Sequence, residues 1–281
     1  MGREVKIIAH TLVKNEQRWI WYSLNSVLDY IDQIMVWDTG SSDRTVEIIK
    51  TIKSPKIKFT QAGTVDENSF TQVRQKMLDS TPTDFHWLMI LDGDEIWPRE
   101  SIKTATDFAR RNLSYESIVV RTNNLVGDIY HRLPESTGMY HLAGRIGHLN
   151  LRFINLKAIP GLHAAKPHGQ QGYFDAVGKL IQDRDPQKIK FLDVYYHHAT
   201  HLQRSTSRQL DLATVKRAQK LKFELGGKMS RDQIPEIFFE PHPAIVPDVT
   251  SPASLSFWLK SLLLTIPKRV KRTLLAPKHG Y

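Results

Sequence analysis

The chain has 281 residues, 41% of them hydrophobic, which is ordinary for a globular protein of one large domain or two small ones. It has no cysteine, which excludes disulfides, thiolate metal sites and a cysteine nucleophile. The formal net charge is +10, and residues 251–281 contribute six basic side chains and no acidic one. This distribution argues against a protein-wide nucleic-acid surface and for a basic tail with a partner of its own.

Strands and helices are expected to alternate through the first 122 residues. Apolar β-rich runs predict strands at 4–13, 33–38, 56–62, 85–91 and 116–122. Apolar residues at three- and four-residue spacings predict helices at 15–31, 39–52, 67–80 and 99–113. The second helix follows a turn at Gly40, with Ser42 or Asp43 as its N-cap. This alternation predicts an α/β protein with a mostly parallel central sheet covered by helices on both sides. Because the N-terminus has no signal-peptide-like apolar region, we expect a cytoplasmic protein.

The second half is less regular. Residues 123–200 are rich in loops, with short strands expected at 150–155 and 191–197. Residues 205–225 predict a basic amphipathic helix that ends at Gly226 and Gly227. A proline-rich connector then leads to the basic tail.

Three carboxylates follow the apolar strand at 85–91, in the sequence HWLMILDGDEIW. Asp92, Asp94 and Glu95 would raise one another's pKa values unless a cation neutralised them. Their place is the carboxyl end of a central strand, where open α/β sheets bind ligands. Asp92 and Asp94 flank Gly93 and can face one Mg²⁺ or Mn²⁺ that also binds a nucleotide diphosphate. The alternative is a solvated polar turn.

Three sequence elements occur together in one order. They are the KNE loop at 14–16, the segment DTGSSDRT at 38–45 and the segment LDGDE at 91–95. In this order and spacing they resemble the family 2 glycosyltransferases, which have the GT-A fold. The resemblance covers residues 5–130, with a weaker match at 197–227. It implies a metal-dependent, inverting glycosyltransferase with a Rossmann-like nucleotide-binding sheet.

The resemblance also implies a division of the chain. Residues 1–125 would bind the nucleotide sugar, and residues 126–204 would form the acceptor half of the same GT-A domain. Residues 205–247 would be the basic helix and connector, and residues 248–281 the amphipathic tail. The implied nucleotide-binding residues are Thr11, Val13, Asn15, Glu16, Asp38, Arg74 and Asp92. A helix cap is preferred as the role of Asp43.

For the metal, the resemblance implies Asp94 as a direct ligand and Asp92 close to the metal or the ribose. A late histidine is a common further ligand, and His198 and His201 are the candidates, with structural histidines as the alternative. His197 and His198 would point to opposite faces of an extended segment, so at most one can reach the site. The cofactor expected is Mn²⁺ or Mg²⁺. Arg204 could neutralise the leaving diphosphate or lie at a solvated helix end.

Inverting transfer requires a base for the acceptor hydroxyl. Many relatives carry a His-Glu pair after a strand similar to LRFIN, and this chain has GLHAAKPHGQQGYFD there instead. The base is therefore unassigned, with candidates Asp128, Glu135, Asp175 and Glu95. The donor expected is a nucleoside diphosphate sugar of the UDP or GDP type. The acceptor expected is a glycan or a lipid-linked molecule, in surface polysaccharide or glycolipid biosynthesis.

The tail SLSFWLKSLLLTIPKRVKRTLL is too short in its apolar run to span a bilayer. It predicts an interfacial helix on an anionic membrane, with Phe257 and Trp258 inserted, at the inner face of the membrane. The alternative is a C-terminal helix docked on its own domain. Two other functions remain open: a metal-dependent phosphotransferase or phosphatase that uses Asp92 as nucleophile, and a non-catalytic membrane-binding module.

Overall fold

The computed structural model describes residues 4–66, 69–167, 170–214, 217–275 and 278–279. The strands within these residues are β1 (Ile7–Val13), β2 (Gln33–Asp38), β3 (Ile57–Gln61), β4 (Trp87–Ile90), β5 (Glu95–Ile96), β6 (Ser117–Val126), β7 (Asp128–Arg132), β8 (Tyr140–Leu142), β9 (Arg145–Gly147), β10 (Leu149–Asn155), β11 (His163–Ala165), β12 (Gly172–Phe174), β13 (Ile189–His198), β14 (Gly227–Lys228) and β15 (Lys278–His279). The α-helices are α1 (Ile20–Val27), α2 (Thr45–Thr51), α3 (Phe70–Asp79), α4 (Arg99–Arg111), α5 (Arg208–Ala213) and α6 (Leu255–Thr273).

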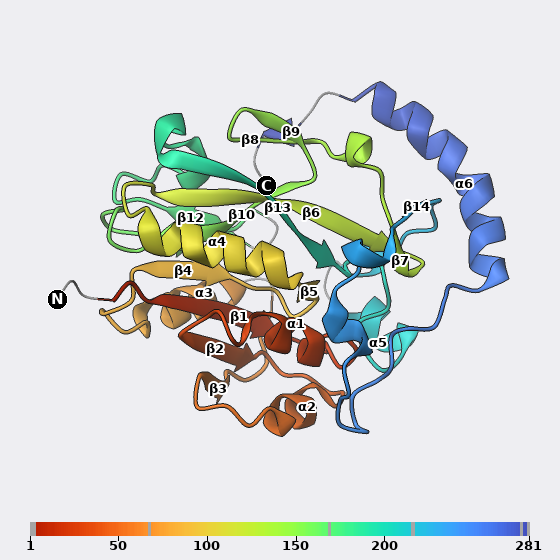
Figure 1. Ribbon diagram of the computed structural model, residues 1–281, viewed down its shortest axis with the longest axis horizontal. Helices are drawn as coiled ribbons and strands as arrows, with labels where there is room; N and C mark the ends of the chain where they lie inside the picture. The colour runs from red at the N-terminus through yellow and green to blue at the C-terminus, as the bar shows by residue number, and fades with distance from the viewer. Residues whose placement is uncertain (1–3, 67–68, 168–169, 215–216, 276–277, 280–281) are drawn as a thin grey trace.

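One large sheet organises the molecule (Figure 1). Its strand order is β14-β7-β6-β10-β4-β1-β2-β3, and β13 pairs with both β6 and β5. The four strands β3, β2, β1 and β4 are parallel, as crossover helices require. Strand β10 runs antiparallel between β4 and β6, and β13 runs parallel to β6. The sheet therefore joins the two halves of the sequence.

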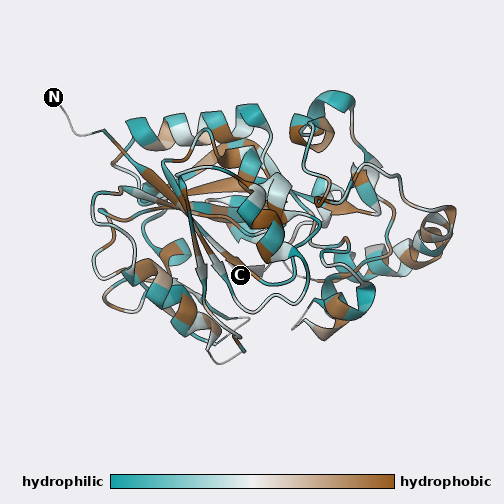
Figure 2. Ribbon diagram, turned by 90° about the horizontal axis from the view of Figure 1, so that it is seen from below, coloured by the Kyte–Doolittle hydropathy of each residue, from teal (hydrophilic) through white to brown (hydrophobic). Residues whose placement is uncertain are grey.

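Two apolar cores lie on the two faces of the sheet. Successive side chains of β1 point to opposite faces, so Ile7 and Ala9 belong to one core and Ile8 to the other. The first core includes residues of α1, α2 and α4, and the second includes residues of α3. In Figure 2 the central strands are largely brown, while the helices around them mix teal and brown. The near-continuous apolar sequence of these strands follows from burial on both faces.

The alternation predicted for the first 122 residues is confirmed, with most elements shorter than expected, β2 as predicted and β6 longer. The first helix begins at Ile20 rather than at residue 15. Asn15 has a φ of 54°, in the left-handed region that asparagine tolerates better than most residues. Its side-chain oxygen accepts a hydrogen bond from the backbone N–H of Ser42 at 2.8 Å. The KNE loop is thus held against the next loop before the helix starts.

The long basic helix predicted at 205–225 is wrong. Helix α5 covers only Arg208–Ala213, and Thr214 is already extended, with φ −82° and ψ 130°. The cause is a set of buried polar contacts made by the side chain of Asp211. Asp211 accepts the backbone N–H groups of Arg204 and Ser205 at 3.0 and 3.1 Å, and Arg217 turns inward to contact Asp211 at 3.1 Å. These inward contacts replace the regular helical continuation.

Helix α6 lies along the outside of the molecule in Figure 1. Ser254 caps it by accepting the backbone N–H of Phe257 at 3.2 Å. Near its other end, Lys268 donates to the backbone carbonyl of Phe223 at 2.8 Å, and Arg272 pairs with Glu224. The helices within the described residues are too short or too polar for one of them to cross a membrane.

Candidate active site

The three carboxylates lie in the turn between β4 and β5. The turn closes where the backbone N–H of Glu95 donates to the carbonyl of Asp92 at 3.1 Å. Gly93 lies where the turn approaches the KNE loop, and a Cβ added there would come within 2.9 Å of Cγ of Glu16. Glycine is therefore required by close approach, which leaves the turn directly against β1 and its following loop.

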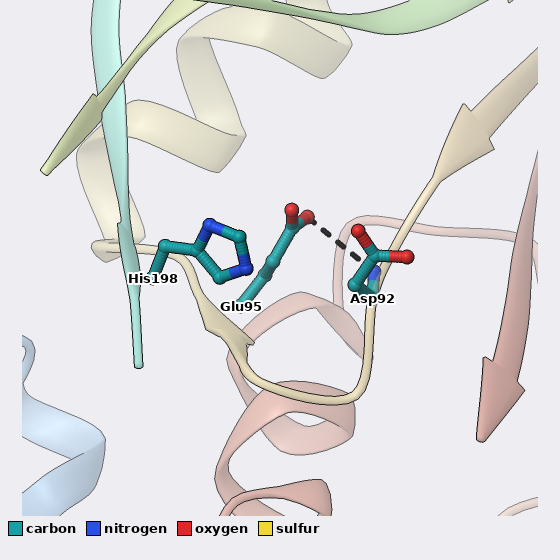
Figure 3. A group of neighbouring side chains, drawn as sticks. All are labelled: Asp92, Glu95 and His198. Atoms are coloured by element: carbon teal, nitrogen blue, oxygen red, sulfur yellow. Dashed lines mark hydrogen bonds between the residues drawn. The ribbon is translucent and has the colours of Figure 1, made fainter. Parts of the chain in front are cut away.

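A histidine from the second half of the chain completes the cluster. Strand β5 pairs with β13 so that Glu95 lies opposite His198. One ligand atom each of Asp92, Glu95 and His198 lie within 4.8 Å of one another, and Figure 3 shows the three side chains converging. Nε2 of His198 is also 3.3 Å from Oδ2 of Asp94. Sheet topology thus brings together residues more than 100 positions apart in the sequence.

Arg152 supplies a positive charge inside the cluster. It lies on β10, and its Nη2 contacts Glu95 directly and lies 3.5 Å from Oδ2 of Asp92. Its Nε and Nη2 also donate to the hydroxyl of Tyr196, at 3.1 and 2.8 Å. Because Arg152 is only 5% exposed, its charge acts on the carboxylates with little screening by water.

A second set of ion pairs holds Asp94. Nη2 of Arg204 lies 3.1 Å from Oδ1 of Asp94, and its Nε donates to Glu16 at 2.8 Å. Arg217 reaches Glu16 at 2.7 Å and Asp211 at 3.1 Å. The network ties the KNE loop to the segment after β13. The network also explains why so many buried carboxylates can lie close together: their negative charge is offset by buried arginines from distant segments.

The carboxylates of the turn differ in pKa. Burial is the largest single influence on the pKa of Asp92 and would raise it, but the charges of Arg152, Arg74 and His198 together outweigh burial and leave the pKa lowered. Burial likewise opposes ionisation of Asp94, and Arg204, His198 and Lys220 together overcome it and hold the pKa far below its usual range. Burial raises the pKa of Glu95 well above its usual value, with the charges of its acidic neighbours adding to the effect and Arg152 opposing it. The surroundings therefore favour the ionised form of Asp92 and Asp94 and the protonated form of Glu95.

The donor set fits a divalent cation. Both side-chain oxygens of Asp94 are buried; Arg204 and His198 lie 3.1 and 3.3 Å from them, but among the described residues neither oxygen accepts a hydrogen bond of good geometry. Carboxylate oxygens suit Mg²⁺ or Mn²⁺, and an imidazole nitrogen suits Mn²⁺ better. Asp92, Glu95 and His198 each place one such atom within 4.8 Å of the others, and Asp94 adjoins this group through His198. Glu95 is also near, but its contact with Arg152 already occupies it.

A cavity of about 830 Å³ opens beside the cluster. This volume lies within the range of small-molecule sites in proteins. Asp92, Arg152 and His198 form part of its wall. Other polar and charged side chains on the wall include Arg74, Asn124, His148, Asn150, His201, Lys220, Lys222 and Arg272. The charged side chains of the wall are thus mostly cationic, which favours a ligand that carries negative charge.

The family model described as glycosyl transferase family 2 matches residues 10–164, more than half of the chain. The chain belongs to this family. It is similar to the SPbeta prophage-derived glycosyltransferase SunS of Bacillus subtilis, with 28% identity over 137 residues that cover 48% of this chain and 31% of that protein. It is 30% identical over 95 residues to an uncharacterized glycosyltransferase of Rickettsia bellii, covering 34% of this chain and 30% of that protein. The matches thus span less than a third of the length of these relatives.

Solved structures show a likeness of fold. TarS 1-349 of S. aureus superposes with a TM-score of 0.45 and 17% identity, covering 70% of this chain and 61% of that chain. A complex of the Mycobacterium tuberculosis glucosyl-3-phosphoglycerate synthase with Mn²⁺, UDP and glucosyl-3-phosphoglycerate has the same TM-score and identity, covering 78% of both chains. The expected fold class is confirmed: the chain has a mostly parallel, curled central sheet with flanking helices.

The predicted nucleotide-binding residues fall into two groups. Arg74 and Asp92 line the cavity. The others, on β1, the KNE loop and the end of β2, are not part of its wall: Thr11, Val13, Asn15, Glu16 and Asp38. Asp38 accepts the backbone N–H groups of Gly40 and Ser41, both at 3.1 Å, which shapes the turn after β2. Asp43 accepts the backbone N–H of Thr45 at 3.0 Å, but the N-cap of α2 is Arg44 and carries no side-chain cap hydrogen bond, so the cap expected at Ser42 or Asp43 is wrong.

The histidines of β13 separate as alternation requires. His198 faces Asp94, whereas Nε2 of His197 is bonded to the carbonyl of Gln233 at 2.8 Å on the opposite side. His201 lines the cavity, and its Nδ1 is bonded to the carbonyl of Lys220 at 2.7 Å. His198 is therefore the histidine in contact with the carboxylate cluster.

The four candidates for the base lie in different places. Glu95 is inside the cluster, under Arg152. Asp128 accepts the backbone N–H of Ala253 at 2.8 Å, Glu135 pairs with Arg121 at 2.9 Å, and Asp175 pairs with Arg184. Within the described residues, none of the four forms part of the cavity wall. Each of the last three is committed to a contact that stabilises a loop or a strand.

Arg152 is the residue of the site that the sequence reasoning missed. The signal was present: it is the one charged side chain in LNLRFIN, a strand whose residues are all buried. A buried arginine needs an acidic partner, so its position in that strand indicates a contact with buried carboxylates. Tyr196 of β13, whose hydroxyl accepts hydrogen bonds from Arg152, was also missed.

Proposed function

We propose that this glycosyltransferase moves a sugar from a nucleoside diphosphate sugar of the UDP or GDP type to an acceptor hydroxyl, with inversion. One observation carries the proposal. A carboxylate cluster with a histidine lies at the carboxyl end of β4, the edge at which α/β sheets bind nucleotides, and it opens on a cavity of suitable volume. A solvated polar turn would show neither the buried histidine contact nor the cavity.

We assign Asp92, Asp94 and His198 as the residues that would hold Mn²⁺ or Mg²⁺. A divalent cation bound there supplies charge stabilisation for the departing diphosphate. The chain's own residues fix the geometry. Arg204 and Arg152 hold the two aspartates in place, while Arg74 and Lys220 on the cavity wall add positive charge toward a diphosphate.

For the base, Glu95 is the candidate we carry forward. It is the only one of the four predicted carboxylates in the cluster, among the described residues. The other three make contacts outside the cluster. Glu95→Gln should lower the turnover rate and leave nucleotide affinity nearly unchanged.

The acceptor we propose is a glycan or lipid-linked molecule of surface polysaccharide or glycolipid biosynthesis. The cytoplasmic face of a membrane is the proposed place of action, reached through a peripheral contact of the basic tail. Support comes from the basic composition of residues 251–281 and from the position of α6 on the outside of the molecule.

The test is donor turnover. A panel of UDP and GDP sugars is incubated with Mn²⁺, with Mg²⁺ or with a chelator, and release of the free diphosphate is measured. We expect one donor to be turned over only with metal, and Asp94→Asn to reduce the rate by at least about 100-fold. Asp193→Asn is the matched control, because Asp193 is 76% exposed and pairs only with Arg121 at the surface. Equal turnover by Asp94→Asn and wild type would refute the proposed site.

A further inference from the structure

Helix α6 and the residues after it carry most of the exposed large apolar side chains. Of the fourteen such side chains among the described residues, nine lie between 255 and 275. They are Leu255, Leu259, Leu262, Leu263, Leu264, Ile266, Val270, Leu274 and Leu275. Leu255 and Leu263 are each 75% exposed. A concentration of this kind marks an interaction surface in a soluble chain, whereas single exposed leucines do not.

The helix docks on the protein mainly through polar residues, with Phe257 and Trp258 beside them. Ser261 and Thr265 are buried, and Thr265 Oγ1 accepts the backbone N–H of Leu225 at 2.9 Å. Lys268 and Arg272 are tied to the segment 223–224 on the same side. A surface helix of a globular protein normally buries its apolar face. In α6 this arrangement is reversed, so its apolar face is left for a partner.

At 100° per residue, seven of the exposed residues fall within an arc of about 120°. These seven form what we name the leucine stripe: Leu255, Leu259, Leu262, Leu263, Ile266, Val270 and Leu274. The aromatic residues do not belong to it. Trp258 packs on His131, with ring centroids 4.5 Å apart, and Phe257 packs on Phe223 at 5.5 Å. The expectation that Phe257 and Trp258 insert into a membrane is thus wrong for this arrangement, and aliphatic side chains face outward instead.

The charge beside the leucine stripe identifies the partner. Lys260 and Lys271 are exposed and lie at one edge of the stripe by the same helical geometry. Residues 251–281 contain no acidic side chain. Two copies of the chain packed stripe to stripe would bring these lysines together without a carboxylate to offset them, at an electrostatic cost. An anionic lipid surface meets both requirements, because it accepts aliphatic side chains and attracts lysines.

The end of the helix reaches the cavity. Arg272 and Leu275 line the cavity together with Lys222. We propose that the leucine stripe lies in the interface of an anionic bilayer and that the cavity thereby takes the polar headgroup of a lipid-anchored acceptor past Arg272 and Leu275. The statement about the acceptor rests on the proposed glycosyl transfer, whereas the statement about the surface does not.

The surface is tested with vesicles of phosphatidylcholine, alone or mixed with phosphatidylglycerol, by co-sedimentation of the whole protein. We expect binding to the mixed vesicles that weakens as salt is raised. The variant Leu259→Ser/Leu263→Ser/Ile266→Ser should bind at least roughly tenfold more weakly. Lys260→Gln and Lys271→Gln should each weaken binding roughly fivefold, on anionic vesicles only. The variant Leu113→Ser/Ile146→Ser/Val177→Ser, which removes three exposed aliphatic residues elsewhere, should bind like wild type.

Each other outcome overturns a defined part of the inference. No vesicle binding by wild type, or equal binding by the stripe variant, refutes the membrane surface. A dimer in solution that the stripe variant abolishes, without vesicle binding, assigns the stripe to a second copy instead. Nucleotide binding is measured on the same samples: if it persists without vesicle binding, the proposed function stands and this inference fails. Vesicle binding without nucleotide binding under any metal condition removes the acceptor statement.

Discussion

Asp94 shows how a single residue depends on the distant parts of the chain. Its carboxylate is 1% exposed, yet its surroundings favour the ionised form, because Arg204 and His198 lie 3.1 and 3.3 Å away. Neither partner is within 100 positions of it in sequence. The local sequence predicts that something neutralises the cluster, and only the fold shows that two arginines and a histidine do so.

Gly93 gives a prediction at the same scale. Gly93→Ala would place a methyl group 2.9 Å from Cγ of Glu16 and 3.1 Å from Cγ1 of Val13. Glu16 cannot move aside easily, because Arg204 and Arg217 hold its carboxylate. We expect a loss of roughly 1–3 kcal/mol in the free energy of unfolding, measured by urea titration, together with weaker nucleotide binding.

Gly227→Ala is the control for this substitution. The nearest atom to an added Cβ at Gly227 is 3.9 Å away, an ordinary contact distance. If Gly93→Ala and Gly227→Ala unfold at the same urea concentration, the close approach of the turn to the KNE loop is not a constraint on the fold.

At the scale of elements, the segment after β13 holds the KNE loop in place through contacts of Gln203, Arg204 and Arg217, which we call the clamp. Arg217 donates to the carbonyls of Asn15 and Lys14, at 2.7 and 2.8 Å. The backbone N–H of Arg18 donates to the carbonyl of Arg204 at 3.0 Å, and Nε1 of Trp19 donates to the carbonyl of Gln203 at 2.8 Å. The clamp therefore positions the loop that borders the candidate site.

Removing one cation from the clamp should lower the free energy of unfolding. Arg217→Met leaves Glu16 and Asp211 with one arginine fewer, and their side chains are only 2% and 0% exposed. We expect a loss of roughly 3–5 kcal/mol of stability and faster amide exchange in residues 14–18, by hydrogen exchange with mass spectrometry. Arg44→Met removes an exposed pair with Glu47 and should change stability by less than about 1 kcal/mol. Equal effects of the two substitutions would contradict the clamp.

Prediction from sequence succeeded where local pattern decides structure. The apolar runs of β1, β2 and β4 and the spacing of α3 and α4 follow from burial on the two faces of one sheet. It failed at 205–225, where amphipathic spacing suggested a long helix. There the side chain of Arg217 finds partners some 200 residues earlier in the chain and also pairs with Asp211, and these tertiary contacts outweigh local helix propensity.

The candidate site, like the fold, could be predicted from the sequence only in part. The turn from Asp92 to Glu95 and the face of β13 that carries His198 follow from motif and alternation. Arg152 could have been found from its place in a buried strand, but its register against β4 and β6 could not. The orientation of α6 is the clearest failure, because composition predicts an amphipathic helix without saying which face docks on the protein.

For the molecule as a whole, buried histidines predict a dependence of stability on pH. Burial lowers the pKa of His10 to about 3 and that of His148 to about 4, from an ordinary value of 6.5. In the unfolded chain these side chains take up protons near pH 6.5, while in the folded chain they remain neutral until much lower pH. The contribution of these histidines to stability is therefore fully present above about pH 6.5, and it is lost progressively as the pH falls from there toward 4 and 3.

His10→Gln tests this dependence. Between about pH 7 and about pH 5, wild type should lose stability, and the variant should lose roughly 1–2 kcal/mol less, as measured by urea unfolding at both pH values. Glutamine keeps a polar group near Thr81 Oγ1, which lies 3.0 Å from Nε2 of His10. An identical loss in the two proteins would show that His10 is protonated to the same extent in the folded and unfolded chains.

The central claim is that the cluster beside β4 binds a nucleoside diphosphate together with a divalent cation. The most direct measurement is calorimetric titration of UDP and of GDP, with and without Mn²⁺, into wild type, Asp94→Ala and the surface control Asp193→Asn. We predict that one nucleotide binds wild type and the control in the presence of Mn²⁺, and that Asp94→Ala loses this binding. Binding that does not need metal, or that survives Asp94→Ala, would contradict the claim.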